Sequence, residues 1–155
     1  MHESFSLEEL YPLIADVIAS GESFRLYPRG TSMEPMLYAG RDSVLLGAVD
    51  KIEKGDVLLY RRTNGAFVLH RLIEKRDGTL TMCGDHQCDL EYGIAESQVL
   101  AKVVGYSVGD EYRALDSKEY RKFMRARVRR FPFYRRDPKL HAFLRKVKHM
   151  LQGKK

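Results

Sequence analysis

The feature that most constrains the fold is a series of short β-rich segments in the middle of the chain, each bounded by a turn signal. Glycine-containing turns separate them at Ala39-Gly40, Lys54-Gly55-Asp56, Asn64-Gly65 and Asp77-Gly78. The segments are residues 24–27, 43–46, 57–62, 66–73, 79–82 and 99–106. Asn-Gly between two strand-like runs is typical of a β-hairpin. Six short strands with few helices predict a mainly β protein built on a compact, coiled antiparallel sheet.

A helix is expected before this β region. Ser6 and Glu9 have the spacing of a capping box. The apolar residues that follow fall on one helical face, namely Leu10, Ile14, Val17 and Ile18. Pro12 lies inside this pattern and leaves open whether the regular helix begins after Ser6 or only at Tyr11.

The period becomes helical again from Ser117. One apolar stripe is formed by Tyr120, Phe123, Met124, Val128 and Phe131. Pro132 is expected to interrupt this helix, and Asp137-Pro138 to begin another as N-cap and first helical residue. The second helix would carry a stripe of Leu140, Phe143, Leu144, Val147 and Leu151.

Charge divides the chain into the same two parts. Residues 1–117 hold 12 Lys+Arg and 19 Asp+Glu, a net charge of −7, whereas residues 118–155 hold 15 and 2, a net charge of +13. We therefore expect a β domain with its N-terminal helix over residues 1–116 and a basic amphipathic helical tail over residues 117–155. Two interpretations of the tail stay open: its stripes pack on the β domain, or they lie on an anionic membrane surface. Nucleic acid is an unlikely partner because no DNA-reading motif is present.

Length and cysteine content narrow the class of protein. A chain of 155 residues fits one domain, and none of its apolar stretches approaches the roughly 20 residues that span a bilayer. No secretory signal peptide is visible at its start. The two cysteines, Cys83 and Cys88, suggest a reducing compartment, so we expect a cytoplasmic protein, either free or peripheral at the membrane. His86 lies between them, but a second ligand pair is missing, so neither a metal nor any other cofactor is expected.

Ser32 is the candidate nucleophile. Gly30 gives access to backbone conformations that most residues avoid, and Pro35 fixes a dihedral angle just beyond the serine. Such a turn can expose a hydroxyl beside converging backbone N–H groups, as an oxyanion hole requires. The plainer alternative is a Ser/Thr-rich cap before a short helix.

His70 is the candidate general base. Strand alternation places Val68, His70 and Leu72 on one face, where apolar neighbours favour a neutral imidazole. A hydrogen-bonded structural histidine is the alternative. In the segment Cys83-Gly84-Asp85-His86-Gln87-Cys88-Asp89, either Asp85 or Asp89 could orient this imidazole, or form an Asx-turn instead.

Four boxes together resemble the signal peptidase I and SOS-repressor (LexA-type) superfamily of serine peptidases. They are Ser32-Met33-Glu34-Pro35, Gly55-Asp56 with the apolar run after it, His70-Arg71 and Gly84-Asp85, in the family's order between about Gly21 and Gly105. The resemblance implies a coiled β-fold, with Ser32 as nucleophile, His70 as base and cleavage after small side chains. A histidine base is similar to the archaeal and endoplasmic-reticulum type, in which an aspartate assists; Asp85 matches it, with Asp89 as the alternative acid.

Three departures from the family accompany this match. One is His86-Gln87 at the position of the usual polar pair after Gly-Asp. No membrane anchor is present, and Gly30 stands where many signal peptidases carry a serine that aids the oxyanion hole. Thr31 or backbone N–H groups near Ser32 and Met33 would replace it. The closest likeness is to small soluble bacterial members of the superfamily.

These observations lead to a functional hypothesis with two rivals. We expect a serine endopeptidase that removes a leader or signal-like segment from a peptide or precursor protein, using Ser32 and His70 with Asp85 assisting. One rival is a catalytically inactive peptide-binding module of the same fold. The other is a regulator of repressor-type ancestry.

Overall fold

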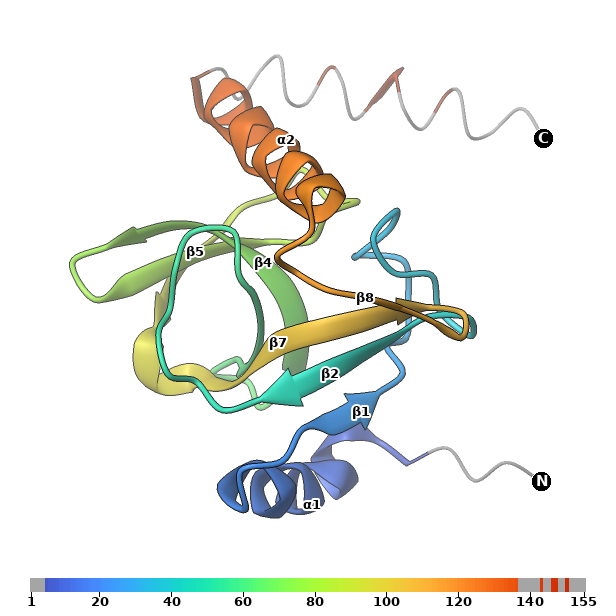
Figure 1. Cartoon of the computed structure of the whole chain (residues 1–155). Helices are drawn as coiled ribbons and strands as arrows, with labels where there is room; N and C mark the ends of the chain where they lie inside the picture. Colours follow the sequence, from blue (N-terminus) through green and yellow to red (C-terminus); the bar gives the residue numbers. More distant parts are fainter. Residues whose placement is uncertain (1–4, 137–142, 144–145, 148–149, 151–155) are drawn as a thin grey trace.

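The computed structural model describes residues 5–136, 143, 146–147 and 150. In this part the chain is mainly an antiparallel β-sheet, with one helix before it and one after it, at opposite ends of the sheet in Figure 1. The elements are α1 (Leu7–Ala19), β1 (Phe24–Leu26), β2 (Ser43–Gly47), β3 (Val57–Arg61), β4 (Phe67–Arg76), β5 (Thr79–Cys83), β6 (Glu91–Ala95), the 3₁₀ turn η1 (Glu96–Gln98), β7 (Val99–Val108), β8 (Glu111–Arg113) and α2 (Lys118–Arg136).

The strands form one eight-stranded sheet. Its order is β1-β2-β7-β3-β4-β5-β6, with β8 paired to β7, and every pair is antiparallel. The register shifts within four of these pairs, β2–β7, β3–β7, β4–β5 and β5–β6. Such irregularities bend strands and increase their twist. The mainly β, antiparallel prediction is confirmed, whereas the short strands β6 and β8 were not predicted.

Two of the predicted turns join neighbouring strands directly. β3 and β4 form a hairpin across Asn64-Gly65, with Gly65 at φ +89° and the Asn64 side chain accepting a hydrogen bond from the N–H of Ala66 at 3.1 Å. β4 and β5 meet across Asp77-Gly78, where φ is +49° and +74°. Positive φ at both positions is what a tight hairpin turn requires. Both β3 and β4 carry residues of the site described below.

The capping box of α1 is confirmed, and it decides where the helix begins. The Ser6 side chain accepts a hydrogen bond from the Glu9 N–H at 3.2 Å, and the Glu9 carboxylate accepts one from the Ser6 N–H at 2.7 Å. The helix therefore begins at Leu7 and includes Pro12, so a start at Tyr11 is wrong. Ile14, 1% exposed, packs this helix against the sheet.

α2 packs part of its first apolar stripe on the β body. Tyr120 and Val128 are buried, and Phe123 and Met124 pack against the main core cluster. The helix continues past Pro132 to Arg136, so the expected interruption there is wrong. A proline removes one backbone donor, and the packed turns before it hold the rest of this helix in place.

The second predicted helix lies almost entirely outside the described residues. Its expected start at Asp137-Pro138 and most of its apolar stripe are not described; of that stripe, Phe143 is 61% exposed. Across the described ranges, neither helix is both long and apolar enough to cross a bilayer.

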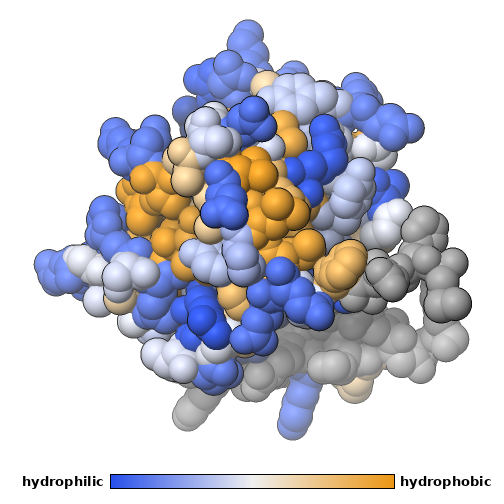
Figure 2. All heavy atoms as spheres, turned by 90° about the horizontal axis from the view of Figure 1, so that it is seen from below, coloured by the Kyte–Doolittle hydropathy of each residue, from blue (hydrophilic) through white to orange (hydrophobic). Residues whose placement is uncertain are grey.

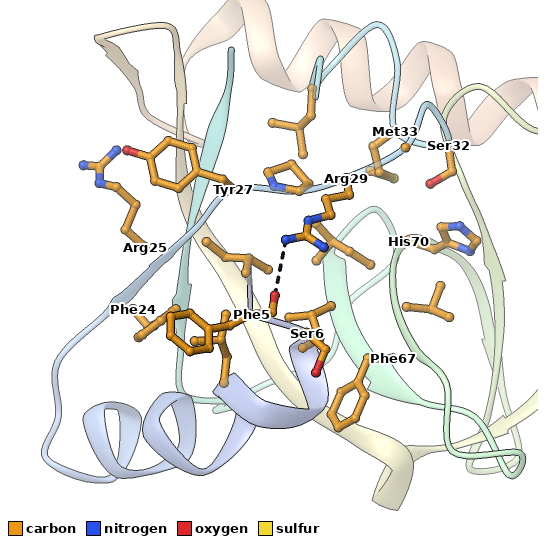
Figure 3. A pocket seen from close by; sticks show the side chains of 18 of the residues that line it. Phe5, Ser6, Phe24, Arg25, Tyr27, Arg29, Ser32, Met33, Phe67 and His70 are labelled. Atoms are coloured by element: carbon orange, nitrogen blue, oxygen red, sulfur yellow. Dashed lines mark hydrogen bonds between the residues drawn. The ribbon is translucent and has the colours of Figure 1, made fainter. Parts of the chain in front are cut away.

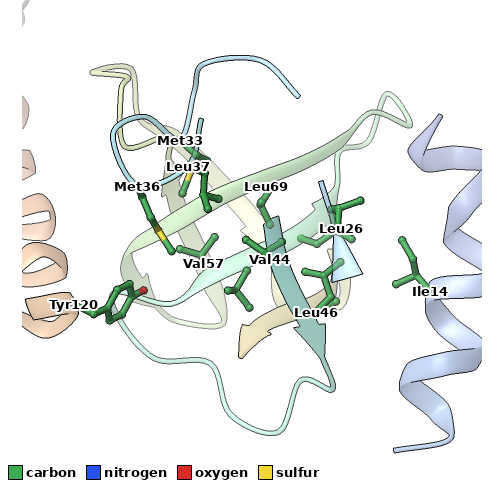
Figure 4. Packing of buried hydrophobic residues seen from close by; sticks show 13 residues of the cluster. Ile14, Leu26, Met33, Met36, Leu37, Val44, Leu46, Val57, Leu69 and Tyr120 are labelled. Atoms are coloured by element: carbon green, nitrogen blue, oxygen red, sulfur yellow. The ribbon is translucent and has the colours of Figure 1, made fainter. Parts of the chain in front are cut away.

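The main core lies between the sheet, α1 and the turn that follows β1 (Figure 4). Met33, Met36 and Leu37 from that turn are at most 5% exposed and pack among strand residues such as Val57 and Leu69. Burying three large apolar side chains within five residues anchors the turn firmly. This is the turn that carries Ser32.

Candidate active site

A pocket of about 840 Å³ opens between α1, β1, β4 and the turn after β1. Ser32 and His70 both line it, although they lie 38 positions apart in the sequence (Figure 3). Much of the remaining lining is apolar, including Phe24, Leu26, Phe67 and Leu69. Apolar walls with a few convergent polar groups are typical of a ligand pocket.

Two contacts clamp the Gly-Asp loop onto the serine turn. The N–H of His86 donates to the carbonyl of Ser32 at 2.8 Å. A Cβ atom on Gly84 would lie 2.5 Å from the same carbonyl oxygen and 3.1 Å from the Ser32 Cβ, which is too close for any side chain. Only glycine at position 84 therefore allows this approach, and two of the boxes that carry the family resemblance meet at one point.

Backbone N–H groups are available beside the serine hydroxyl. Within the described part of the chain, the N–H groups of Ser32 and Met33 have no protein hydrogen-bond acceptor. Gly30, at φ +77°, provides the left-handed conformation that leads into this turn. Unpaired N–H groups near a nucleophile are what an oxyanion hole needs. Thr31 is exposed and lies outside the pocket lining, whereas Met33 lines the pocket and is 4% exposed.

His70 lies in the middle of β4, directly opposite Leu58 of β3. It is 5% exposed, and its Nδ1 lies 3.4 Å from the Tyr60 hydroxyl, which projects from the same face of β3. Burial lowers the pKa of His70 from 6.5 to about 4, helped by the positive charge of Arg62 and opposed by Glu91 and Asp85. The imidazole is therefore neutral at pH 7 and able to accept a proton.

Ser32 and His70 face one another across the edge of the pocket in Figure 3. Among the hydrogen bonds of the described residues, none joins the two side chains. Catalytic hydrogen bonds are often long in the absence of substrate and shorten when substrate binds. The arrangement is compatible with a serine nucleophile and a histidine base in the absence of substrate.

Asp85 has a different partner from the one expected. Its carboxylate accepts two hydrogen bonds from Arg71, both at 2.7 Å, and both side chains are 0% exposed. Arg71 follows His70 on β4, so the two side chains point to opposite faces of the sheet. Asp89 is exposed in the loop before β6. Asp85 therefore has a structural role as the counter-ion of Arg71. Its role in orienting His70 stays a prediction.

Four residues at the site had no predicted role, although Arg71 belongs to one of the four boxes. They are Tyr60, Arg62, Arg71 and Glu91. Tyr60 was contained in a predicted strand, and alternation from His70 across a hairpin would have placed it on the same face. Glu91 belongs to β6, which was itself missed. Gln87, which follows the Gly84-Asp85 box, also lines the pocket.

The cysteines near the site form no disulfide with each other. Cys83 and Cys88 are both free thiols. In the residues that the structure covers, no group of three or more His, Cys, Asp or Glu side chains is arranged to hold a metal ion.

Comparison with known proteins adds no relative: no family model, no curated protein and no solved structure matches this chain. The resemblance to signal peptidases therefore stays a prediction that depends on the four boxes.

A catalytic role for His70 as a base predicts how the rate of cleavage would depend on pH. With His70 as the base, only the neutral imidazole could accept a proton, so we expect the rate to stay constant from neutral pH down to about pH 5 and to fall with a midpoint at about pH 4. Between pH 6.5 and 4 the unfolded state binds a proton at His70 that the folded state does not. The free energy of unfolding therefore also decreases as the pH is lowered through this range. Initial rates, with circular dichroism at each pH to confirm folding, provide the measurement. A midpoint at 6.5 or above in folded protein would contradict this prediction.

Proposed function

We propose that this chain is a serine endopeptidase of the signal peptidase type, in which Ser32 is the nucleophile and His70 the general base. The observation that carries the proposal is the meeting of Ser32 with a buried, neutral histidine in one apolar pocket. The mainly antiparallel sheet and the contact between Gly84 and the serine turn support the family resemblance.

The proposed reaction uses three residues that line the pocket, Ser32, Met33 and His70. His70 takes the proton of the Ser32 hydroxyl as the oxygen attacks the scissile carbonyl, and the N–H groups of Ser32 and Met33 bind the oxyanion. The imidazolium then gives its proton to the leaving amine, which departs and leaves an acyl-serine. Water, deprotonated by the same imidazole, hydrolyses the ester and restores the hydroxyl.

The expected substrate is an extended leader or signal-like segment of a peptide or precursor protein. The pocket runs from the Ser32–His70 pair past β4 to β1 and the start of α1, with apolar side chains along it. Among the described strands, β1 lies at the edge of the sheet and pairs only with β2. Apolar residues of the substrate would lie in this pocket, with a small residue at the scissile bond as in the resembling family.

We propose that the location of the protein in the cell depends on surfaces away from the catalytic pair. Figure 2 shows apolar side chains gathered on the face that carries α1 and β1, and Leu13 of α1, which lies outside the pocket lining, is 53% exposed. The basic tail adds +13 over residues 118–155. We propose contact of the tail with an anionic membrane surface in a cytoplasmic protein, since each basic residue near such a surface contributes about 1 kcal/mol.

A peptide-binding module without turnover is the second candidate. It is favoured by the missing hydrogen bond between Ser32 and His70. Such a module would bind the same extended segment in the same pocket and release it unchanged.

A fluorophosphonate probe separates the two candidates. We expect the wild-type protein to be labelled at Ser32, as mass spectrometry of the digested protein would show, and labelling to vanish in Ser32→Ala and His70→Gln. Ser97→Ala is the control, because Ser97 is an exposed serine outside the pocket. A correctly folded protein that stays unlabelled over a wide range of pH would favour the binding module.

A further inference from the structure

A chain of hydrogen bonds leads away from the pocket behind His70. The His70 Nδ1 lies 3.4 Å from the Tyr60 hydroxyl, and that hydroxyl lies 2.7 Å from the Glu91 carboxylate. Arg62 closes the chain with two hydrogen bonds to Glu91, at 2.8 and 2.7 Å. The residues come from β3, β4, β6 and the β3–β4 turn, so the sheet fixes their spacing.

Arg62, at the far end of this chain, determines which group donates and which accepts in each hydrogen bond. The guanidinium of Arg62 can only donate, so Glu91 accepts, and the hydrogen bonds from Arg62 lower the pKa of Glu91 and keep it ionised. An ionised carboxylate has no proton to give. Tyr60 must therefore donate its single proton to Glu91. Its oxygen is left only as an acceptor toward His70.

We infer that Tyr60 and Glu91 are positioning residues that hold His70 in the tautomer with its proton on Nδ1. The importance of this tautomer for catalysis rests on the proposed function. The Nδ1–H donates to the Tyr60 oxygen, and the lone pair of the imidazole then lies on Nε2. Nε2 is the nitrogen left to face the pocket and the hydroxyl of Ser32. A tyrosine thus stands between the base and its carboxylate.

The same chain acts again when His70 becomes protonated. The positive charge of the imidazolium strengthens the hydrogen bond to Tyr60, and Tyr60 is polarised by the ionised Glu91 behind it. Tyr60 itself stays protonated, because burial and the neighbouring carboxylate raise its pKa. The chain therefore stabilises the charge that develops during attack without giving up a proton of its own.

Nitrogen-15 NMR of the histidine ring tests this inference without any substrate. At pH 7 we expect the His70 signal, assigned by its loss in His70→Gln, to show a protonated Nδ1 and an unprotonated Nε2. In Tyr60→Phe the acceptor is gone, and we expect the Nε2-protonated form to appear. Tyr92→Phe, an exposed tyrosine on β6, is the matched control and should leave the tautomer unchanged.

Cleavage kinetics supply the second readout. We expect Tyr60→Phe to lower kcat by roughly 100-fold with KM nearly unchanged, because the substrate pocket is intact and only the base is misoriented. Glu91→Gln, at a partly exposed position, is expected to lower kcat in the same way should Tyr60→Phe fail to fold. Glu96→Gln removes an exposed pairing with Lys75 and is the control with the same chemical change.

The outcomes separate this inference from the proposed function. A wild-type His70 protonated on Nε2, or a Tyr60→Phe variant with unchanged tautomer and kcat, would overturn the positioning role. If the wild-type protein were not labelled at Ser32 by the fluorophosphonate but showed the Nδ1–H tautomer, the peptidase proposal would be overturned instead. The hydrogen-bond chain would then remain as a structural feature.

Discussion

Replacing Asp85 by asparagine is expected to lower the free energy of unfolding by about 3–5 kcal/mol. The change leaves the Arg71 guanidinium buried without its counter-charge, since both side chains are 0% exposed. Arg71 also donates to the carbonyl of Gly55 at 2.8 Å and to the hydroxyl of Tyr120 at 3.1 Å. The ion pair therefore joins β4, the loop before β3, the Gly-Asp loop and α2.

Urea denaturation followed by circular dichroism measures this loss. Glu111→Gln is the control, because it removes an ion pair of 2.7 Å to Arg113 that is solvent-exposed, and we expect a change below about 1 kcal/mol. Replacing both buried partners together, Arg71→Met with Asp85→Leu, should recover part of the lost stability because no unpaired charge remains. If Asp85→Asn were as stable as the wild type, Arg71 would not depend on this carboxylate.

Ser32→Ala is expected to reduce the rate of peptide cleavage by roughly 10⁴-fold or more while leaving the melting temperature nearly unchanged. The reaction loses its nucleophile, whereas the fold loses only a hydroxyl that makes no hydrogen bond within the described chain. The turn keeps its shape through the buried Met33 and Met36 and through the hydrogen bond from the N–H of His86 to the Ser32 carbonyl.

Fluorogenic peptides with an apolar segment followed by alanine are suitable substrates for this test. Ser97→Ala, far from the pocket lining, is the control and should cleave at the wild-type rate. Substantial turnover by purified, folded Ser32→Ala would contradict the serine mechanism.

Local patterns were enough to predict most of the secondary structure. The capping box at Ser6 and Glu9, the Asn64-Gly65 turn and six strand-like runs all have counterparts in the structure. Each depends on residues within a few positions of one another, so the sequence carries the information directly. β6 was missed because Glu91 and Gly93 have low strand propensity, and this strand is formed by pairing with β5 at the edge of the sheet.

Pro132 is a case in which the local pattern gives the wrong prediction. A proline within a helical pattern predicts a break because it lacks a donor and collides with the preceding turn. The helix continues to Arg136 nevertheless, and the packing of Tyr120, Phe123 and Met124 with the main core is not visible in the local pattern. Tertiary contacts therefore outweighed a local signal.

For the candidate site, the sequence by itself nominated Ser32 and His70, because the residue types and the order of the four boxes are written in the chain. Only the tertiary structure decided which groups surround them. His70 and Arg71 are neighbours that point to opposite faces of β4, and the fold brings Asp85 to the face of Arg71 and Tyr60 with Glu91 to the face of His70. The reason is physical: alternation fixes that two side chains diverge, but the side on which each distant loop packs depends on how the whole sheet coils.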